Sequence, residues 1–272
     1  MFGVVLIYFV CVIFRIVEYF VLHTDRTIVG EAIIHKLLGI LVMIIAAKRL
    51  GYSAEEIGFT KGKSFWNILK GLAFGICVFI LAYATEIIIL VSQGRFDSLK
   101  VFVSAYAIDK NIGNRTEFIF FLICIIGNVV NVVMEEGLFR GLFMKMLSNK
   151  QTFIKAACVT SLLFGLWHVV SPIRNYIEGT SSMGGMIMNC LMLFITSTLV
   201  GFKFVMLTSG TGNLYMAMGD HFVNNTIVNL LHVMSSTGGD EMMVVRVSVA
   251  QTVSFIAVLI WYIKKRKRQS DI

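Results

Sequence analysis

Three short patterns place polar side chains inside apolar stretches of this sequence. They are two adjacent glutamates followed by an arginine, a phenylalanine followed by a histidine, and a histidine followed by an asparagine: Glu135, Glu136 and Arg140; Phe164 and His168; His221 and Asn225. An ionisable side chain at the centre of a bilayer costs about 2.5–3.5 kcal/mol on insertion scales, so it marks a functional site by default. Such groups on three separate segments indicate one polar site built by several helices.

The chemistry that suits these residues is the hydrolysis of a peptide bond. A carboxylate and an imidazole, here Glu135 and His168, can converge on one water molecule and deprotonate it for attack on a carbonyl. His221 and Asn225 can donate hydrogen bonds to the oxyanion that forms. Alternatively, Glu135, His168 and His221 hold a zinc ion with an open position for water. The sequence lacks H-E-x-x-H, the most familiar zinc-protease signature, and the residues alone leave both versions open.

Helical spacing predicts different roles for the two adjacent glutamates. Glu136 and Arg140 are four residues apart, where opposite charges meet on a helix, and arginine suits a buried carboxylate pair. We therefore expect that pair to be structural, with Glu135 pointing about 100° away and available for chemistry. Phe164 precedes His168 by one turn, and we expect its ring to shield the imidazole from lipid.

The elements that position these residues are expected to be membrane-spanning helices. The chain has 272 residues, of which 57% are hydrophobic and 15% charged, whereas soluble domains have about 45–50% and about 25%. A span needs about 20 mostly apolar residues. The candidate stretches are residues 3–22, 31–47, 68–92, 119–147, 152–170, 183–202, 212–234 and 246–263. We predict an all-α polytopic membrane bundle of about eight transmembrane helices, forming a single integral-membrane domain over 1–272 with a motif-bearing core at about 117–235.

The charged residues predict an orientation and leave one question open. The net charge is +8, and a basic run, 264–268, follows the last apolar stretch. Such a run anchors a helix end at the cytoplasmic leaflet, so eight spans put both termini in the cytoplasm. Because the run has no interleaved aromatic residues, we expect no nucleic-acid partner. Glu86 is a further carboxylate in an apolar stretch; pairing with Lys36 and a protonated state are both open.

The ordered set of patterns resembles the CPBP family of intramembrane proteases. This group includes the CAAX prenyl endopeptidases and the bacterial abortive-infection (Abi) and bacteriocin-processing or self-immunity proteins. The resemblance covers residues 135–225, whereas residues 1–115 carry no motif that we assign. It implies that Glu135 is the catalytic glutamate and that His168 helps to activate water. It also implies that His221 and Asn225 stabilise the oxyanion and that Glu136 and Arg140 form a supporting pair.

The resemblance implies an intramembrane endopeptidase acting on membrane-associated or leader-bearing peptides, either CAAX-like or bacteriocin-type. The family has been described both as metalloproteases and as metal-independent glutamate proteases. We favour the version that needs no cofactor, because the set is poor in histidine and has two groups suited to hydrogen-bond donation; zinc is the alternative. The short chain has no recognisable prenyl-binding feature, which favours a bacterial peptide-processing or immunity role in the cytoplasmic membrane. The expected partners are membrane lipid and a peptide or protein substrate, and the oligomeric state is left open.

Two functions of other classes compete with this interpretation. A non-catalytic membrane protein can give bacteriocin self-immunity on the same fold, since function resides in the site and not in the fold. A transporter or proton relay also uses intramembrane glutamates and histidines. Helices broken in mid-span by glycine or proline favour transport, but the only proline, Pro172, lies at the end of a predicted span, so we rank transport last.

Overall fold

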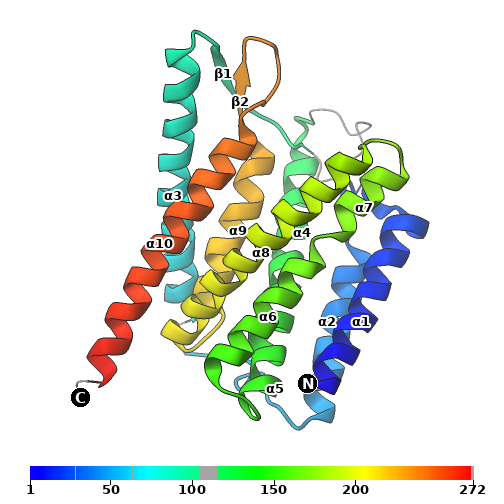
Figure 1. Cartoon of the computed structure of the whole chain (residues 1–272), viewed down its shortest axis with the longest axis vertical. Helices are drawn as coiled ribbons and strands as arrows, with labels where there is room; N and C mark the ends of the chain where they lie inside the picture. Colours follow the sequence, from blue (N-terminus) through cyan, green and yellow to red (C-terminus); the bar gives the residue numbers. More distant parts are fainter. Residues whose placement is uncertain (28, 63, 105–114, 271–272) are drawn as a thin grey trace.

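The computed structural model describes residues 1–27, 29–62, 64–104 and 115–270. It is a helical bundle with a two-stranded sheet at one end (Figure 1). The elements in chain order are α1 (Phe2–Val17), η1 (Glu18–Leu22), η2 (Thr24–Arg26), α2 (Ile34–Arg49), α3 (Ser64–Ser92), β1 (Phe96–Val101), α4 (Phe118–Glu135), η3 (Glu136–Phe143), α5 (Met144–Ser148), α6 (Phe153–Trp167), α7 (Val170–Ile177), α8 (Met183–Thr211), α9 (Tyr215–Leu230), β2 (Leu231–Ser235) and α10 (Met243–Ser270).

The prediction of a membrane helical bundle is confirmed, whereas the count of eight spans is not. Within the described part of the chain, six helical stretches are long and apolar enough to cross a membrane: Phe2–Arg26, Ser64–Ser92, Phe118–Ser148, Phe153–Ile177, Met183–Thr211 and Met243–Arg268. The two other predicted spans contain α2 and α9, which have only 16 residues each. At a rise of about 1.5 Å per residue, each of these helices is about 24 Å long, shorter than the hydrocarbon core of about 30 Å.

The predicted span 212–234 is shortened because its last residues form a strand. β2 pairs antiparallel with β1, with Val101 opposite Leu231 and Leu99 opposite Val233. The apolar run continues through this strand, and hydropathy alone does not separate a helix from a strand in a short apolar segment. The sheet stands at the end of the bundle opposite the two termini (Figure 1).

A buried polar cluster joins α3, β2 and α10 below this sheet. Arg246 donates to Glu86 Oε2 at 2.7 Å and to Asp240 Oδ2 at 2.7 Å, and His232 Nδ1 lies 3.1 Å from Asp240 Oδ2. Glu86 therefore pairs with Arg246, and not with Lys36, which pairs with Glu31. Burial acts to raise the pKa of Asp240, but hydrogen bonds from His232 and Arg246 together hold it below its usual range.

The contact between helices α3 and α9 depends on glycine. A Cβ atom on Gly71 would lie 2.2 Å from the carbonyl oxygen of Met216, and one on Gly219 would lie 2.5 Å from the carbonyl oxygen of Ile68. Small residues let two helix backbones approach in this way. The contact fixes α9, which carries the third sequence pattern, against the long helix α3.

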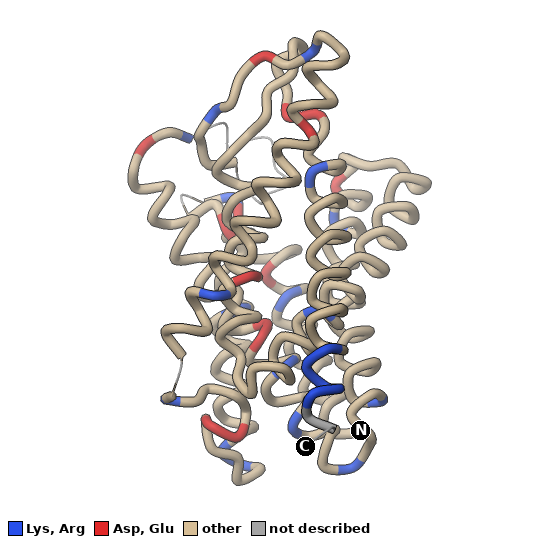
Figure 2. The backbone as a smooth tube through the Cα atoms, turned by 90° about the vertical axis from the view of Figure 1, so that its left-hand side faces the viewer, with Lys and Arg blue, Asp and Glu red and all other residues tan. Residues whose placement is uncertain are grey.

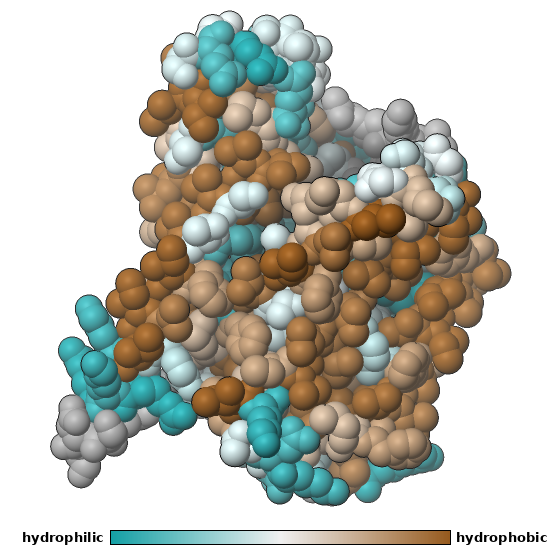
Figure 3. Space-filling model, viewed as in Figure 1, coloured by the Kyte–Doolittle hydropathy of each residue, from teal (hydrophilic) through white to brown (hydrophobic). Residues whose placement is uncertain are grey.

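The surface of the bundle is apolar along its sides and polar toward its ends. Figure 3 shows brown, hydrophobic residues covering the middle of the visible face, with hydrophilic residues gathered at the top and bottom. Both termini lie at the same end of the bundle (Figure 1), and the basic residues that precede the C-terminus lie at that end (Figure 2). This distribution suits a protein embedded in a bilayer.

Candidate active site

The first sequence pattern lies at a change of helix type. α4 ends at Glu135, and the next eight residues, Glu136–Phe143, form the π-helix η3. The sequence predicts one continuous helix over 119–147, because a π-helical segment has no hydropathy signature. Such segments are rare and occur frequently at functional sites. Every residue of η3 is buried, so the change occurs inside the bundle.

Glu135 lies where α4, α6 and α9 meet. Its carboxylate is buried, with an exposed fraction of 4%. Trp167 Nε1 donates a hydrogen bond to Oε1 at 3.0 Å, and His221 Nε2 lies 3.5 Å from Oε2. The structure thus brings together residues from the first and third patterns that are far apart in the sequence, and it adds an indole that the patterns do not include.

Glu136 contacts both Arg140 and His221. Arg140 Nη1 lies 3.4 Å from Glu136 Oε1, as the spacing predicts, and His221 Nδ1 lies 2.8 Å from the same oxygen. A carboxylate only accepts hydrogen bonds when ionised, so His221 Nδ1 carries the proton in this contact. The expectation that Glu136 has a purely structural role is therefore incomplete, because this glutamate also orients the imidazole.

Aromatic rings enclose the buried guanidinium and the imidazole. The Arg140 guanidinium lies 3.9 Å from the centre of the Phe164 ring and 5.2 Å from that of Phe204. Phe204 also stacks on His221 with ring centres 4.7 Å apart. Cation–π contacts of this kind are worth about 2 kcal/mol or more when they are desolvated. The Phe164 ring therefore contacts the Arg140 guanidinium as well as the His168 imidazole.

His168 caps the C-terminus of α6, in the break between α6 and α7. Its Nδ1 lies 2.8 Å from the carbonyl oxygen of Phe164, and the two rings meet edge to face with centres 4.7 Å apart. Because a carbonyl oxygen only accepts, Nδ1 carries the proton and Nε2 is the basic nitrogen of the neutral ring. His168 is half-buried and interacts electrostatically with Glu135.

Asn225 follows His221 by one turn of α9. Its Oδ1 accepts a hydrogen bond from Asn224 Nδ2 at 3.1 Å, and its side chain is half-buried. The spacing of four residues places the amide on the same face of the helix as the imidazole. The structure thus keeps the third pattern on one helix face.

Residues outside the three patterns complete the surroundings of Glu135. The Arg15 guanidinium of α1 lies 4.6 Å from the centre of the Trp167 ring, and His35 of α2 packs on the same indole with ring centres 5.8 Å apart. The sequence patterns missed Trp167, although a buried indole N–H usually requires a hydrogen-bond partner. They also missed Arg15, because nothing in the sequence indicates that α1 lies against α6.

The zinc alternative requires Glu135, His168 and His221 to act as ligands. Among the residues that the structure describes, no group of three His, Cys, Asp or Glu side chains is arranged to hold a metal ion. Two imidazoles and a carboxylate are a suitable donor set for zinc, but these three are not assembled as one. We therefore derive no step of the reaction through a metal.

Comparison with known proteins agrees with the resemblance that the motifs indicate. Residues 117–227 match the family model described as type II CAAX prenyl endopeptidase Rce1-like, and this segment contains all three patterns. No curated protein matches the chain. The predicted resemblance to the CPBP family is confirmed, and the match supports an integral membrane protease of the CAAX type whose substrate is a peptide or protein.

Proposed function

We propose that the chain is an intramembrane endopeptidase in which Glu135 and His168 activate water. His221 and Asn225 stabilise the oxyanion, and Glu136 and Arg140 support them. The observation that carries this proposal is the burial of Glu135 beside His221, with Nε2 and Oε2 3.5 Å apart, while Glu136 holds the other nitrogen of the ring. This places a carboxylate that can take a proton from water beside an imidazole that is oriented by a second carboxylate and can donate to the oxyanion.

The proton positions support a division of roles between the two histidines. His168 has its basic Nε2 available to share in taking a proton from water, because its Nδ1 donates to Phe164. His221 Nδ1 donates to Glu136, so Nε2 donates to a developing oxyanion when the ring is protonated. The Trp167 N–H, 3.0 Å from Glu135 Oε1, leaves the other carboxylate oxygen to accept a proton from water.

The proposed topology has both termini in the cytoplasm of a bacterial cell, with α2 and α9 as two short additional crossings. The shared end of the two termini supports an even number of crossings, and the basic run at that end supports its cytoplasmic location (Figures 1 and 2). An alkaline phosphatase reporter fused after residue 272 should stay inactive, because that enzyme requires the periplasm. An active fusion would contradict the orientation.

The activity is tested in membranes from expressing cells with a library of anchored and leader-bearing peptide reporters, CAAX-like and bacteriocin-type sequences among them. We expect wild type to cleave some of these reporters, and Glu135→Ala and His168→Ala to abolish that cleavage while the protein still inserts. A matched control is Glu86→Gln, which changes a buried carboxylate in the Arg246 cluster and should leave cleavage intact. Loss of cleavage in all three variants would contradict the assigned roles.

A strong zinc chelator separates the two versions of the mechanism. Cleavage by wild type that persists under chelation supports a metal-independent glutamate protease. Cleavage lost under chelation and restored by added zinc supports the zinc-dependent alternative. If wild type cleaves no reporter but Glu135→Ala still protects cells from a bacteriocin, the protein is a non-catalytic immunity protein and the proposal is wrong.

A further inference from the structure

A row of polar side chains from α8, α10 and α9 connects Lys203 to Asn225. Lys203 of α8 forms an ion pair of 2.8 Å with Asp220 and lies with Nζ 3.4 Å from Gln251 Oε1. Gln251 of α10 donates through Nε2 to Asn224 Oδ1. Asn224 then donates through Nδ2 to Asn225 Oδ1 at 3.1 Å. Two amides in series, Gln251 and Asn224, therefore connect a buried ammonium group to the proposed oxyanion residue Asn225.

The direction of this row is fixed by the ammonium group. Lysine has donors and no acceptor, so Gln251 must present its oxygen to Lys203 and its NH2 group to the next residue. Asn224 must then accept at its oxygen and donate to Asn225. In consequence Asn225 accepts from Asn224 at Oδ1, and its NH2 group is the end turned away from Asn224.

We propose that Gln251 and Asn224 are positioning residues that set the orientation of the Asn225 amide for catalysis. A carbonyl oxygen turned toward a developing oxyanion would repel it, whereas an NH2 group stabilises it. The inference rests on the proposed function, because it requires Asn225 to act on the oxyanion. Gln251 lies outside the segment 117–227 that matches the family model, so α10 contributes a residue that the motifs do not include.

Substitution of an amide by a carboxylate of equal size tests the direction directly. Gln251→Glu still accepts from Lys203 but no longer donates, so Asn224 must turn its NH2 group toward the new carboxylate and Asn225 must turn in response. Asn224→Asp reverses Asn225 in the same way. Loss of one oxyanion donor lowers kcat by about 10²–10³-fold, so we expect each variant to lower kcat by about 100-fold with KM nearly unchanged.

Controls separate this inference from simple damage and from failure of the proposed function. Ser254→Ala removes another acceptor of Lys203, at 3.2 Å, but leaves the amide row intact, so its kcat should match that of wild type. Asn225→Ala should lose kcat to the same extent as Gln251→Glu. If Asn225→Ala loses activity while Gln251→Glu and Asn224→Asp do not, the positioning role is wrong. If Asn225→Ala keeps its activity, the proposed oxyanion role is wrong.

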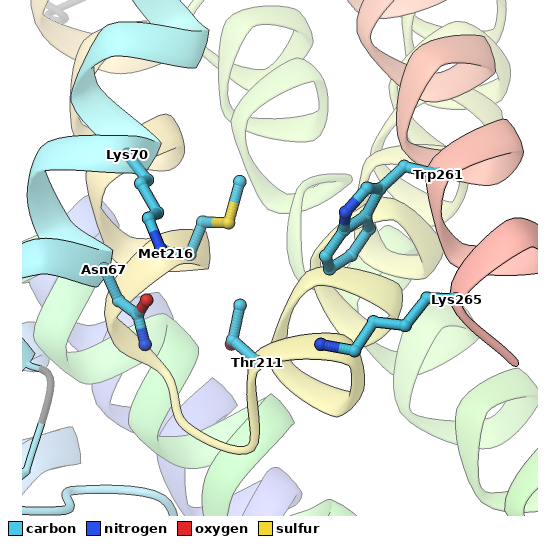
Figure 4. Close-up of a pocket in the computed structure, with 6 residues that line it drawn as sticks. All are labelled: Asn67, Lys70, Thr211, Met216, Trp261 and Lys265. Carbon is cyan, nitrogen blue, oxygen red and sulfur yellow. The ribbon is translucent and has the colours of Figure 1, made fainter. Parts of the chain in front are cut away.

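An independent observation concerns a cavity of about 420 Å³ at the end of the bundle that carries both termini (Figure 4). The cavity is lined by the lysines Lys70 and Lys265, the neutral polar residues Asn67 and Thr211, and the larger side chains of Met216 and Trp261. Figure 4 shows Lys70 and Lys265 extending into it from opposite sides, from α3 and α10. The cavity lies on a different part of α9 from the catalytic cluster.

The lining favours an anion. Among the residues that the structure describes, no acidic side chain lines the cavity and no carboxylate pairs with either lysine. Lys265 Nζ lies 5.5 Å from the centre of the Trp261 ring, which holds one ammonium group at the mouth. Asn67 is buried and donates to Asn213 at 3.1 Å, so the floor of the cavity is ordered. Two ammonium groups and two neutral polar groups suit a phosphate.

We infer that this cavity binds the phosphate of an anionic membrane lipid. One lining residue, Lys265, belongs to the basic run 264–268, and tryptophan and lysine side chains at helix ends meet lipid headgroups. A lipid bound there would contact α3, α8, α9 and α10 together, so it would tie the catalytic helix α9 to its neighbours at one end.

Native mass spectrometry of the purified protein with phosphatidylglycerol and phosphatidylcholine tests this site. We expect wild type to retain phosphatidylglycerol preferentially, and Lys70→Gln/Lys265→Gln to lose about tenfold or more in that preference, because two ammonium groups beside the anionic headgroup are removed. The matched control Lys264→Gln/Arg268→Gln removes the same charge outside the cavity and should keep the preference. Equal losses in both variants would show diffuse attraction and overturn the site. Binding of inorganic phosphate without phosphatidylglycerol would show a soluble-anion site and overturn the lipid assignment.

Discussion

Replacement of Arg140 by methionine removes the charge from the buried pair while keeping most of the side-chain volume. Arg140 and Glu136 are 3% and 0% exposed, and their closest N–O distance is 3.4 Å. Removal of one partner from a buried ion pair costs about 3–5 kcal/mol, because the other charge stays buried and unpaired. We expect a value near the lower limit, since His221 Nδ1 still donates to Glu136 at 2.8 Å.

The assay is equilibrium unfolding in mixed detergent and sodium dodecyl sulfate, applied as a double-mutant cycle. The variants are Arg140→Met, Glu136→Gln and the combination of the two. Residues in contact have interaction energies of about 0.5–3 kcal/mol, and we expect this pair to lie at the upper end because both side chains are desolvated. The double variant should therefore be much more stable than the sum of the single losses predicts.

The activity of the double variant separates the two roles of Glu136. Its stability recovers because no unpaired charge is left, but its cleavage should stay slow, because a carboxylate no longer holds His221 Nδ1. Additive unfolding energies would refute the claim that the pair is electrostatically coupled. Full activity in the double variant would refute the claim that Glu136 orients the imidazole.

Three further predictions follow from the packing around the site and at the two ends of the bundle. Trp167→Phe removes the N–H that donates to Glu135 at 3.0 Å. A hydrogen bond to a charged group contributes about 1.5–3 kcal/mol to stability, so the variant should be less stable than wild type by about that amount in the unfolding assay described above. Unchanged stability would contradict the contact. The pKa of Asp240 is held low by its partners despite burial. Its contribution to stability is therefore present above the unfolded pKa of about 3.9 and is lost as pH falls through the lower folded pKa. Asp240→Asn should be less stable than wild type at pH 7, with a difference that shrinks below about pH 4, and a difference that is constant with pH would contradict this. Gly71→Ala places a methyl 2.2 Å from a backbone oxygen and should cost about 1–3 kcal/mol in the same unfolding assay, whereas Gly184→Ala, with nothing within 4 Å, should not destabilise the protein.

The sequence was sufficient to predict a membrane bundle and the pairing of Glu136 with Arg140. Both depend on local periodicity, which hydropathy and helical spacing report directly. It did not predict that α2 and α9 are only 16 residues long. The apolar run after α9 forms strand β2, and hydropathy does not separate a strand from a helix in a short apolar segment. It also treated 119–147 as one regular helix, because no residue pattern marks the π-helix at Glu136–Phe143.

Contacts between distant segments could not be predicted. The approach of His221 to Glu136, the hydrogen bond from Trp167 to Glu135 and the packing of Arg15 on Trp167 join helices that are far apart in the chain. Periodicity assigns a face to each helix but does not say which other helix that face meets. The pairing of Glu86 with Arg246 was missed for the same reason.

The measurement that tests the central claim most directly is the rate of peptide cleavage by purified Glu135→Gln in lipid vesicles, compared with wild type and Glu86→Gln. Glutamine keeps the size of Glu135 and can still accept the Trp167 hydrogen bond, but it cannot take a proton from water. General-base catalysis contributes about 10²–10⁴-fold, so the account predicts a fall in kcat of at least about 100-fold for Glu135→Gln and none for Glu86→Gln. A wild-type rate in Glu135→Gln would contradict the account.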